Sequence, residues 1–421
     1  MSKQGEYKQT EIGMIPKEWN IVKLGKILSL KNGERPSASK NSIFPIYGAN
    51  GIMGYTSNFL VDNDFTIVVG RVGASGEVHL GTGRIWISDN AIYSENYNKN
   101  KVYMTFLYHL LKFKKISQFA SKSTHPIITQ SFLNAFFLPL PPLPEQKRIA
   151  EILSTVDEAI EKIDEAIART EQLKKGLMQE LLNGSLRVRE LKSSRVGESK
   201  GQGVKTYRLY KPSDPETYKN TEIGRMPKEW EVVRLGDVCT QRKEIILPVG
   251  KGQIKFIGLE HIESGKTKVK SFFTDSGIKS SKFKFYRGDI LYGKLRPYLD
   301  KAVIAEFGGI CSTDLIVLTS DEKKYIKELL IYVLHSDSFI RYAISNTSGT
   351  NHPRTSWKAI SNYNLVYPPL PEQQKIAEIL STIDKRLELL RNKKERLRRV
   401  KKGLMNDLLT GSRRVKRVGE S

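Results

Sequence analysis

Three loop regions in each half of the chain carry side chains that can bind phosphate groups or the edges of bases. Their guanidinium, ammonium, imidazole, amide and hydroxyl groups are the kinds of donor and acceptor that read base edges in a DNA groove. A single Arg or Lys on a loop is more often directed at solvent, and His125 and His352 fit turn positions equally well, so the groups carry more weight than their members. The candidates are Arg35, Lys40, Arg71, Lys122, Thr124 and His125 in the first half, and Arg242, Lys243, Lys294, Arg296, Tyr298, Asn351, His352 and Arg354 in the second.

The sequence lacks the motifs of a catalyst or a cofactor-binding protein. Gly265-Lys266-Thr267 looks like the end of a P-loop, but that motif needs a glycine where Glu260 stands. The Gly70–Gly76 stretch is not followed by the helical pattern that a dinucleotide-binding loop opens. Neither Pro-Pro pair is preceded by Asn or Asp and followed by an aromatic residue, as an amino-methyltransferase would require. With two cysteines and six scattered histidines, we also expect no metal site.

The chain is strongly basic, and this favours a polyanionic partner. Its 421 residues carry a formal net charge of +24, and the sequence pI is about 9.7. Such a surplus repels itself unless a polyanion neutralises it, which indicates nucleic acid or an anionic membrane surface; a solubilising lysine-rich surface is the alternative. The sequence has no signal-peptide core and no apolar run near ~18 residues, so we expect a cytoplasmic protein that does not enter a membrane.

The sequence contains an internal duplication. Motifs in the first half recur in the same order in the second, which chance does not produce. The segments that flank each half agree closely, whereas the interiors, roughly 30–120 and 241–345, agree only in outline. Two copies that share a frame but differ in the middle indicate one scaffold with two specificities. The repeated motifs include Pro16-Lys17-Glu18-Trp19 and Pro227-Lys228-Glu229-Trp230, Leu143-Pro144-Glu145-Gln146 and Leu370-Pro371-Glu372-Gln373, and Lys175-Gly176-Leu177-Met178 and Lys402-Gly403-Leu404-Met405.

Each copy ends in a long predicted helix, Pro144–Leu182 and Pro371–Leu409. Proline is suited to the first turn, where its missing N–H would have no partner, and Gly184 and Gly411 are plausible stops. Apolar residues alternate in steps of four and three, as in a coiled coil. We expect the two helices of one chain to pair antiparallel; packing on their own domains or pairing between two chains are the alternatives. The pairing residues are Ile149, Leu153, Val156, Ile160, Ile163, Ile167, Ile376, Leu380, Ile383, Leu387, Leu390 and Leu397.

The regions before the helices read as α+β domains. Short apolar or alternating runs predict strands at 44–47, 65–69, 76–80 and 84–87, with glycine-rich turns at 48–51, 70–76 and 81–83. Helical patterns follow near 102–120 and, in the second copy, 321–345. The expected division is domain 1 (1–143), helical spacer 1 (144–184), basic linker (185–212), domain 2 (213–370), helical spacer 2 (371–412) and basic tail (413–421).

The doubled pattern resembles a known family. Two variable regions that each end in a Pro-Leu-Pro-Glu-Gln corner, an Ile-Ala-Glu-Ile-Leu helix and Lys-Gly-Leu-Met are similar to the specificity subunits of type I restriction–modification enzymes. The resemblance covers nearly the whole chain. It implies that each variable region is a target-recognition domain for one half of a split DNA sequence, about one helical turn apart. It also implies that the paired helices set the gap between half-sites.

The resemblance further implies a non-catalytic subunit with partners. Two methyltransferase subunits would dock on the helices and restriction subunits would join them. S-adenosylmethionine, ATP and Mg²⁺ would be held by those partners, and no cofactor by this chain. Two rival hypotheses are an autonomous nuclease or methyltransferase, and a coiled-coil adaptor that binds DNA without sequence preference. Binding with steep salt dependence but no preferred sequence would favour the adaptor.

Overall fold

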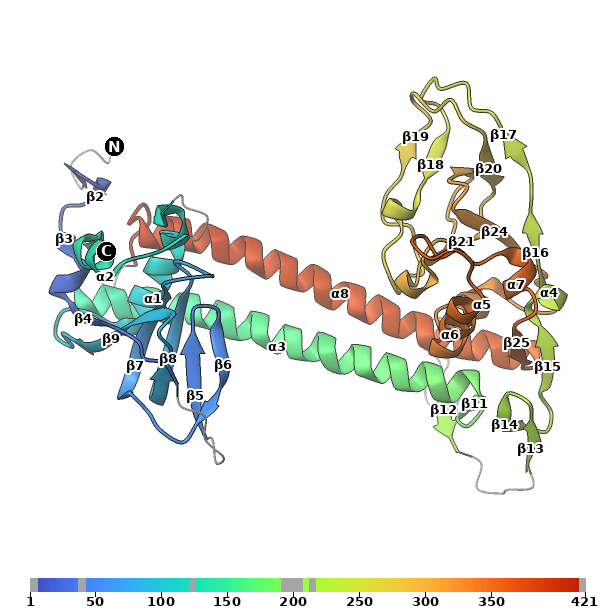
Figure 1. Cartoon of the computed structure of the whole chain (residues 1–421), viewed down its shortest axis with the longest axis horizontal. Helices are drawn as coiled ribbons and strands as arrows, with labels where there is room; N and C mark the ends of the chain where they lie inside the picture. Colours follow the sequence, from blue (N-terminus) through green and yellow to red (C-terminus); the bar gives the residue numbers. More distant parts are fainter. Residues whose placement is uncertain (1–6, 37–42, 122–125, 191–206, 212–216, 416–421) are drawn as a thin grey trace, which may run out of the picture. The chain divides into compact units, whose positions relative to one another are not determined.

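The structure is a computed structural model that describes residues 7–36, 43–121, 126–190, 207–211 and 217–415. The chain forms two compact units that do not follow its linear order. Unit 1 comprises residues 1–166 and 390–421, and unit 2 comprises residues 167–389. Each unit therefore combines one globular domain with a section of both long helices, α3 and α8 (Figure 1).

A six-stranded sheet forms the centre of the domain in unit 1. Its strand order is β4-β9-β7-β8-β5-β6, and every neighbouring pair is antiparallel except β5 with β8. The elements of the domain are β1 (Tyr7–Thr10), β2 (Gly13–Pro16), β3 (Asn20–Lys23), β4 (Leu28–Asn32), β5 (Phe44–Gly48), β6 (Gly51–Thr56), β7 (Val61–Gly70), β8 (Val78–Ile87), β9 (Ala91–Tyr97), α1 (Met104–Phe113), α2 (Gln130–Ala135) and β10 (Phe137–Leu140).

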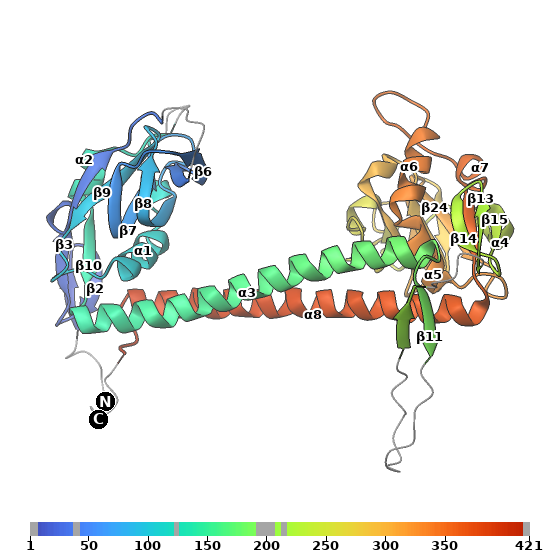
Figure 2. The same ribbon diagram turned by 90° about the horizontal axis from the view of Figure 1, so that it is seen from below.

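Helix α1 joins this sheet to the long helix α3 (Leu143–Leu182) (Figure 2). Phe106, Leu107 and Leu110 of α1 are fully buried in one cluster with Ile67 of β7 and Leu153 of α3. Complete burial of side chains this large contributes about 1.5–3 kcal/mol each. The first turns of α3 are therefore part of the core of the domain rather than an appendage to it.

The two predicted strands at 76–80 and 84–87 are one strand. β8 runs through Gly81–Gly83, where the sequence predicted a turn. The chain does not reverse there because the register with β7 shifts between Asn63 and Thr66, which accommodates the glycines as an irregularity within the ladder. Gly83 takes the positive φ of 65° that such an irregularity favours.

The domain of unit 2 has a four-stranded sheet in place of strands β4, β9, β7 and β8 of unit 1, and a second, separate sheet. A four-stranded sheet has the order β16-β24-β21-β22, and a five-stranded sheet has the order β17-β20-β23-β18-β19. The strands are β11 (Arg187–Glu190), β12 (Tyr207–Tyr210), β13 (Tyr218–Thr221), β14 (Gly224–Pro227), β15 (Glu231–Arg234), β16 (Cys239–Arg242), β17 (Ile245–Ile246), β18 (Lys255–Ile257), β19 (Phe273–Thr274), β20 (Lys282–Phe285), β21 (Ile290–Gly293), β22 (Ala302–Ile304), β23 (Gly309–Cys311), β24 (Leu315–Ser320) and β25 (Asn364–Tyr367).

The helical pattern predicted at 321–345 is two helices. α5 (Lys327–Leu334) ends before His335, and α6 (Asp337–Ser345) begins after Ser336, whose hydroxyl accepts a hydrogen bond from the backbone N–H of Phe339. That N-cap stabilises a new helix start by about 1 kcal/mol and separates the two. Two short helices complete the unit, α4 (Leu235–Val238) and α7 (Trp357–Ile360).

A buried glutamine fixes the proline-rich corner before each long helix. The Gln146 amide donates to the carbonyl oxygens of Pro141 (2.8 Å) and Lys101 (2.9 Å) and accepts from the N–H of Tyr103 (2.9 Å). Gln373 makes the same three bonds in unit 2. Both side chains are fully buried. The repeated glutamine is thus required by the corner, because a buried amide must have its hydrogen bonds satisfied.

Within each unit, sections of α3 and α8 (Leu370–Leu409) run antiparallel. In unit 1, Asp157 pairs with Lys401 and Asp164 with Lys394, so a step of seven forward on α3 matches a step of seven backward on α8. In unit 2, Lys174 of α3 pairs with Asp384 of α8 at 2.6 Å. The predicted antiparallel pairing inside one chain is confirmed, and each helix begins one residue before its predicted proline.

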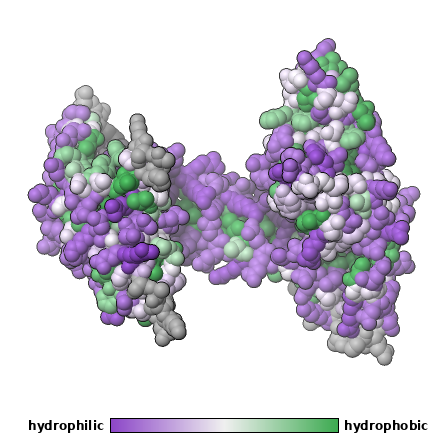
Figure 3. Space-filling model, viewed as in Figure 1, coloured by the Kyte–Doolittle hydropathy of each residue, from purple (hydrophilic) through white to green (hydrophobic). Residues whose placement is uncertain are grey.

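The predicted pairing residues lie on the inner sides of these helices. Ile149, Leu153, Ile163, Ile376, Leu380 and Leu387 are buried. Val156, Ile160, Ile167, Ile383, Leu390 and Leu397 are half-buried. Half of the pairing residues are only partly buried, as is usual where two helices pack on each other without a third layer. The outer surface of the helices is mainly hydrophilic (Figure 3).

Candidate nucleic-acid interface

In unit 1, two loops far apart in the sequence meet at one end of the sheet. The loop after β7 carries Arg71, and its neighbour Val72 forms a β-bridge with Ile127. The N–H of Ile128 donates to the carbonyl oxygen of Arg71 at 3.0 Å. The Ser75 hydroxyl donates to the same carbonyl at 2.9 Å and also contacts the carbonyl oxygen of Pro126. Backbone bonds therefore hold the main chain of Arg71 in place, and its guanidinium makes one long hydrogen bond, to the carbonyl oxygen of Asp89 at 3.4 Å.

A glycine lets the first loop lie against the helical layer. Gly76 has a φ of +83°, and a Cβ there would be 2.3 Å from the backbone nitrogen of Ser117. No other residue allows this approach. The glycine-rich stretch 70–76 is consequently a tightly packed turn that orients Arg71.

Unit 2 repeats this arrangement with other side chains. Leu295 forms a β-bridge with Arg354, and the N–H of Thr355 donates to the carbonyl oxygen of Lys294 at 3.0 Å. The N–H of Arg296 donates to the carbonyl oxygen of Pro353 at 2.8 Å. Lys294 thus occupies the backbone position of Arg71. The same two-loop frame presents different chemistry in the two units.

A third loop, which was not predicted from the sequence, completes each cluster. The N–H of Arg71 donates to the carbonyl oxygen of Asn90 at 2.8 Å, and the N–H of Lys294 donates to that of Asp314 at 3.0 Å. Each of these acceptors follows a serine whose hydroxyl accepts its backbone N–H, Ser88 for Asn90 and Ser312 for Asp314. The repeated pattern of Ser, any residue, then Asn or Asp before an apolar strand was the available signal.

Side-chain contacts make the cluster of unit 2 rigid. Arg354 forms an ion pair with Asp314, with 3.1 Å between Nε and Oδ1. Asp300, at the end of the Lys294 loop, lies 2.6 Å from Nδ1 of His335, whose other ring nitrogen lies 3.0 Å from the carbonyl oxygen of Ala302. The loop is thereby fixed at both ends.

Two residues of the same loop have unusual environments. Arg296 adopts a φ of 51°, rare for a residue with a side chain, and its Nε is buried without a hydrogen-bond partner. Tyr298 is 53% exposed, which leaves its ring able to stack or to contact a groove. Asn351 and His352, on the facing loop, are exposed. The cluster therefore offers cationic, amide, imidazole and aromatic groups on a fixed backbone.

The third predicted place lies at the same edge of each sheet. β4 ends with Asn32 opposite Ile92, which in turn pairs with Val69 near the end of β7. β16 ends with Arg242 opposite Val317, which pairs with Leu291 near the end of β21. Both strands thus end beside the loops described above. Arg35 and Lys243, which follow these strands, are exposed.

Arg242 is engaged by its own domain. Its guanidinium donates to both carboxylate oxygens of the buried Asp289 (2.9 and 3.2 Å) and to the hydroxyl of Thr319 (3.1 Å), and it lies 4.7 Å from the ring centre of Tyr286. The hydrogen bond to Asp289 raises the pKa of Arg242 above its ordinary value. We therefore leave Arg242 out of the proposed contact surface. Lys40, Lys122, Thr124 and His125 lie outside the described residues.

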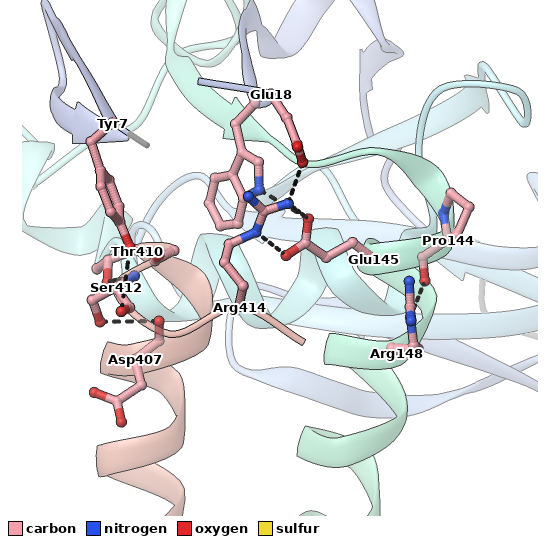
Figure 4. Close-up of polar contacts among 11 residues, drawn as sticks. Tyr7, Glu18, Pro144, Glu145, Arg148, Asp407, Thr410, Ser412 and Arg414 are labelled. Atoms are coloured by element: carbon pink, nitrogen blue, oxygen red, sulfur yellow. Dashed lines mark hydrogen bonds and ion pairs between the residues drawn. The ribbon is translucent and has the colours of Figure 1, made fainter. Parts of the chain in front are cut away.

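A second set of polar contacts links each domain to the end of the other copy's helix. In unit 1, Arg414, which follows α8, forms a fork to Glu145 at 2.7 and 2.9 Å and reaches Glu18 at 2.6 Å (Figure 4). Glu145 also accepts from the indole N–H of Trp19 at 3.1 Å. The fork raises the pKa of Arg414, because the hydrogen bond to Glu145 outweighs the effect of burial.

Unit 2 has the equivalent contacts around Glu372. Arg187, which follows α3, makes the same fork at 2.6 and 2.9 Å and reaches Glu229 at 3.1 Å. The indole N–H of Trp230 donates to Glu372 at 3.0 Å. We call these two sets, Glu18, Trp19, Glu145 and Arg414 in unit 1 and Arg187, Glu229, Trp230 and Glu372 in unit 2, the corner clamps. The Trp and Glu residues of the clamps had been recognised from the sequence as repeats, but Arg187 and Arg414 had not, and none of the contacts was predicted.

Other classes of site are not seen in the part of the chain that the structure describes. Over the described ranges, His, Cys, Asp and Glu side chains form no group of three or more able to hold a metal ion. None of the described helices combines the length and apolar character needed to cross a bilayer.

Comparisons with known proteins identify the family. The model of the type I restriction modification DNA specificity domain matches residues 16–171 and again residues 227–399. These two matches account for most of the chain and fall on the two sequence repeats. The chain therefore belongs to the family of type I restriction–modification specificity subunits, as the sequence motifs predicted.

Individual relatives agree with this assignment. The chain is 27% identical over 372 residues to the EcoDI specificity subunit of Escherichia coli, a match that covers 86% of this chain and 81% of that one. It is 26% identical over 445 residues to the MjaVIII specificity subunit of Methanocaldococcus jannaschii, covering 99% and 98%. The crystal structure of an S subunit from M. genitalium has the same fold, with a TM-score of 0.63, 16% identity and coverage of 93% and 96%.

Proposed function

We propose that this chain reads a bipartite DNA sequence, with each domain recognising one half-site through its three-loop cluster. The observation that carries the proposal is the equivalence of the clusters: the same backbone hydrogen bonds hold Arg71 in unit 1 and Lys294 in unit 2, whereas the presented side chains differ. Arg and Lys bind guanine edges or phosphates, and Asn binds adenine. A constant frame with variable donors is what two different half-sites require.

We further propose that the chain is non-catalytic and works within a larger complex. Two methyltransferase subunits would dock on the helices, and restriction subunits would join them. Two identical partner subunits would need the same docking surface on both copies of the sequence repeat. Among the exposed residues that are identical in the two helices are Glu151 and Glu378, Thr155 and Thr382, and Glu161 and Glu388. S-adenosylmethionine, ATP and Mg²⁺ would reside on those partners, and the assembly would act in the cytoplasm.

A domain exchange tests the reading of two half-sites. Residues 1–140 are replaced by the equivalent segment of another family member, and the variant is co-expressed with the cognate methyltransferase subunit. Mapping of methylated sites should show one half-site changed and the other kept, about 10 bp away. A change in both half-sites, or in neither, contradicts the proposal. Methylation without any sequence preference would instead favour the non-specific adaptor.

Docking on the helices has its own test. Reversing Glu151, Glu161, Glu378 and Glu388 to lysine should lower the number of methyltransferase subunits bound per chain, measured by light scattering of the purified complex. Replacing only Glu151 and Glu161 with lysine should remove one of the two bound methyltransferase subunits. Unchanged stoichiometry in the fourfold variant contradicts docking at this surface.

A further inference from the structure

The outer face of α8 in unit 1 is strongly basic, and none of the features described so far accounts for it. Between residues 391 and 402 the helix carries eight Lys or Arg residues and one Glu. The corresponding stretch of α3, residues 164–175, carries three cations and three acids. The helices match at their corners, and most of this difference lies in what α8 presents outward; Lys394, which corresponds to Ile167, faces α3 instead.

Most of these cations are not needed for pairing the helices. Lys394 and Lys401 face α3, where they pair with Asp164 and Asp157. Arg398 pairs with Glu395 on its own helix at 2.8 Å. The remaining exposed cations are Lys393, Arg396, Arg399 and Lys402. We call these four residues the α8 basic face, and none of them has an acidic partner among the described residues.

This arrangement is unfavourable for the helix itself. Like charges three or four residues apart, such as Arg396 with Arg399 and Arg399 with Lys402, destabilise a helix by about 0.2–0.5 kcal/mol per pair. Helix α3 has less of this repulsion, because two of the four corresponding positions are uncharged. The residues there are Ala166, Arg169, Gln172 and Lys175. A surface that opposes the stability of its own helix is expected to be neutralised by a ligand.

Unit 1 is also electrically one-sided. The outer face of α3 there carries the exposed Glu151, Glu158, Glu161 and Glu165, whose spacing by three, four or seven residues places them in one stripe. A polyanion is therefore attracted to the α8 side of this helix pair and repelled from the α3 side. The two sides are distinguished by charge, not by shape.

We propose that the α8 basic face binds the phosphate backbone of the DNA outside the bases that the loop clusters read. The nine steps of ~1.5 Å from Lys393 to Lys402 span about 14 Å, a length over which a duplex carries about 8 phosphate charges. The contact is independent of base sequence and belongs to one copy only. A methyltransferase subunit that docks twice needs a surface present twice, and the four residues are not all present on α3. The inference rests on the proposed DNA binding but not on half-site recognition.

The test neutralises the face and measures salt dependence. The complex of the chain with its methyltransferase subunits is prepared with Lys393→Gln, Arg396→Gln, Arg399→Gln and Lys402→Gln combined. Binding to a 40-bp duplex of arbitrary sequence is measured between about 50 and 300 mM salt. Each phosphate contact contributes about 0.9 to the slope of log K against log salt, so the slope should fall by about 2–4. At about 0.1 M salt, affinity should fall at least about 10-fold.

A matched control carries the same change of net charge elsewhere on the helices. It combines Lys147→Gln, Lys162→Gln, Lys385→Gln and Arg386→Gln, all exposed positions outside the face. The control should keep the wild-type slope to within about one unit. An equal fall in both variants means that only overall charge matters, which overturns the proposal.

Further readouts separate the other outcomes. Methylated sites, mapped in cells, should keep their sequence in the face variant, because base reading lies elsewhere; a changed sequence overturns the phosphate role. If the slope of log K against log salt is unchanged but fewer methyltransferase subunits are bound, the face binds an acidic protein partner. That result also overturns the proposed phosphate contact. If the wild-type complex shows no sequence preference, the proposed function fails while this inference stands. Thermal melting should show the face variant at least as stable as wild type, since repulsion is removed.

Discussion

The corner clamps and the loop clusters differ in what the two copies of the chain share. At the clamps, every contacting residue is the same: a Trp, two Glu and one Arg meet in unit 1 and again in unit 2. At the loop clusters the backbone hydrogen bonds and one serine contact, by Ser88 or Ser312, are the same, whereas the presented side chains differ, with Arg71 in one unit and Lys294 in the other.

The difference follows from what each region has to hold. A clamp fixes a domain on the helices by side-chain contacts, so its residues cannot vary without loss of geometry. A loop cluster is held by N–H and C=O groups, which every residue except proline supplies in full. Its side chains are therefore free to change without unfolding the frame. The clamps are thus held by side chains, whereas the loops are held mainly by their backbone, which leaves presented side chains such as Arg71 and Lys294 able to differ.

The largest effect is expected at the clamps. Glu145→Ala or Glu372→Ala leaves a partly buried guanidinium and a buried indole N–H without their acceptor, and removing one partner of a buried ion pair destabilises by about 3–5 kcal/mol. Denaturant unfolding should show losses of similar size in the two variants, because the clamps are equivalent. As a control, Glu229→Ala, at an exposed partner, should lose less than about 1 kcal/mol. A loss below about 1 kcal/mol at Glu372 would refute a structural role for its clamp.

Acid should weaken unit 1 through His109 of α1. This side chain is buried beside Asp157 and Lys401, and burial lowers its pKa to about 4. Its folded pKa lies below the unfolded value of 6.5, so the unfolded state binds more protons between these values. Stability is complete above pH ~6.5 and falls as the pH drops towards 4, by up to about 3 kcal/mol.

A substitution isolates this contribution. His109→Gln should flatten the pH dependence of unfolding between pH 6.5 and 4, measured with denaturant at each pH. In unit 2, Asp384 corresponds to Asp157 in the repeat and accepts a hydrogen bond from Tyr332 (2.9 Å), a group that does not titrate in this range. The variant Tyr332→Phe should therefore leave the slope with pH unchanged. An equally steep slope in His109→Gln would show that other groups cause it.

Glycine substitutions in the long helices should stabilise both units alike. Gly176 and Gly403 lie within α3 and α8, and a Cβ at either would meet nothing within 4 Å. Alanine is favoured over glycine in a helix interior by about 1 kcal/mol. Gly176→Ala and Gly403→Ala should each raise the melting temperature by a similar amount. A gain in one and a loss in the other would mean that the helix ends are not equivalent.

The smallest change in stability is expected at the third loop of each cluster. Asp314→Asn removes the ion pair with Arg354, which is partly exposed and is worth at most about 1 kcal/mol. The backbone bond from Lys294 to position 314 remains, so the fold should persist. Mapping of methylated sites should show relaxed recognition of the second half-site and unchanged recognition of the first. The matched exchange, Asn90→Asp, should affect the first half-site instead; altered recognition in the wrong half contradicts the assignment.

Features that depend on neighbouring residues could be predicted from the sequence. The proline corners, the seam from Ile149 to Ile167 and the ends of the helices at Leu182 and Leu409 follow from local periodicity and stop signals. The strand at 76–87 was divided wrongly, because a glycine run reads as a turn unless the register with β7 is known. The α5–α6 boundary was also missed, since Ser336 as an N-cap is inconspicuous in an otherwise helical pattern.

The sequence by itself determined that two similar domains alternate with two long apolar-striped helices, because periodicity and repetition are properties of the chain. The tertiary structure alone decided which copies meet. Arg187 and Arg414 are repeats of one another, as are Glu145 and Glu372. The sequence therefore does not indicate which arginine pairs with which glutamate. A helix of 40 residues is about 60 Å long, which keeps Arg187 from the Glu145 of its own copy. Antiparallel packing within each unit brings it instead to Glu372, and brings Arg414 to Glu145.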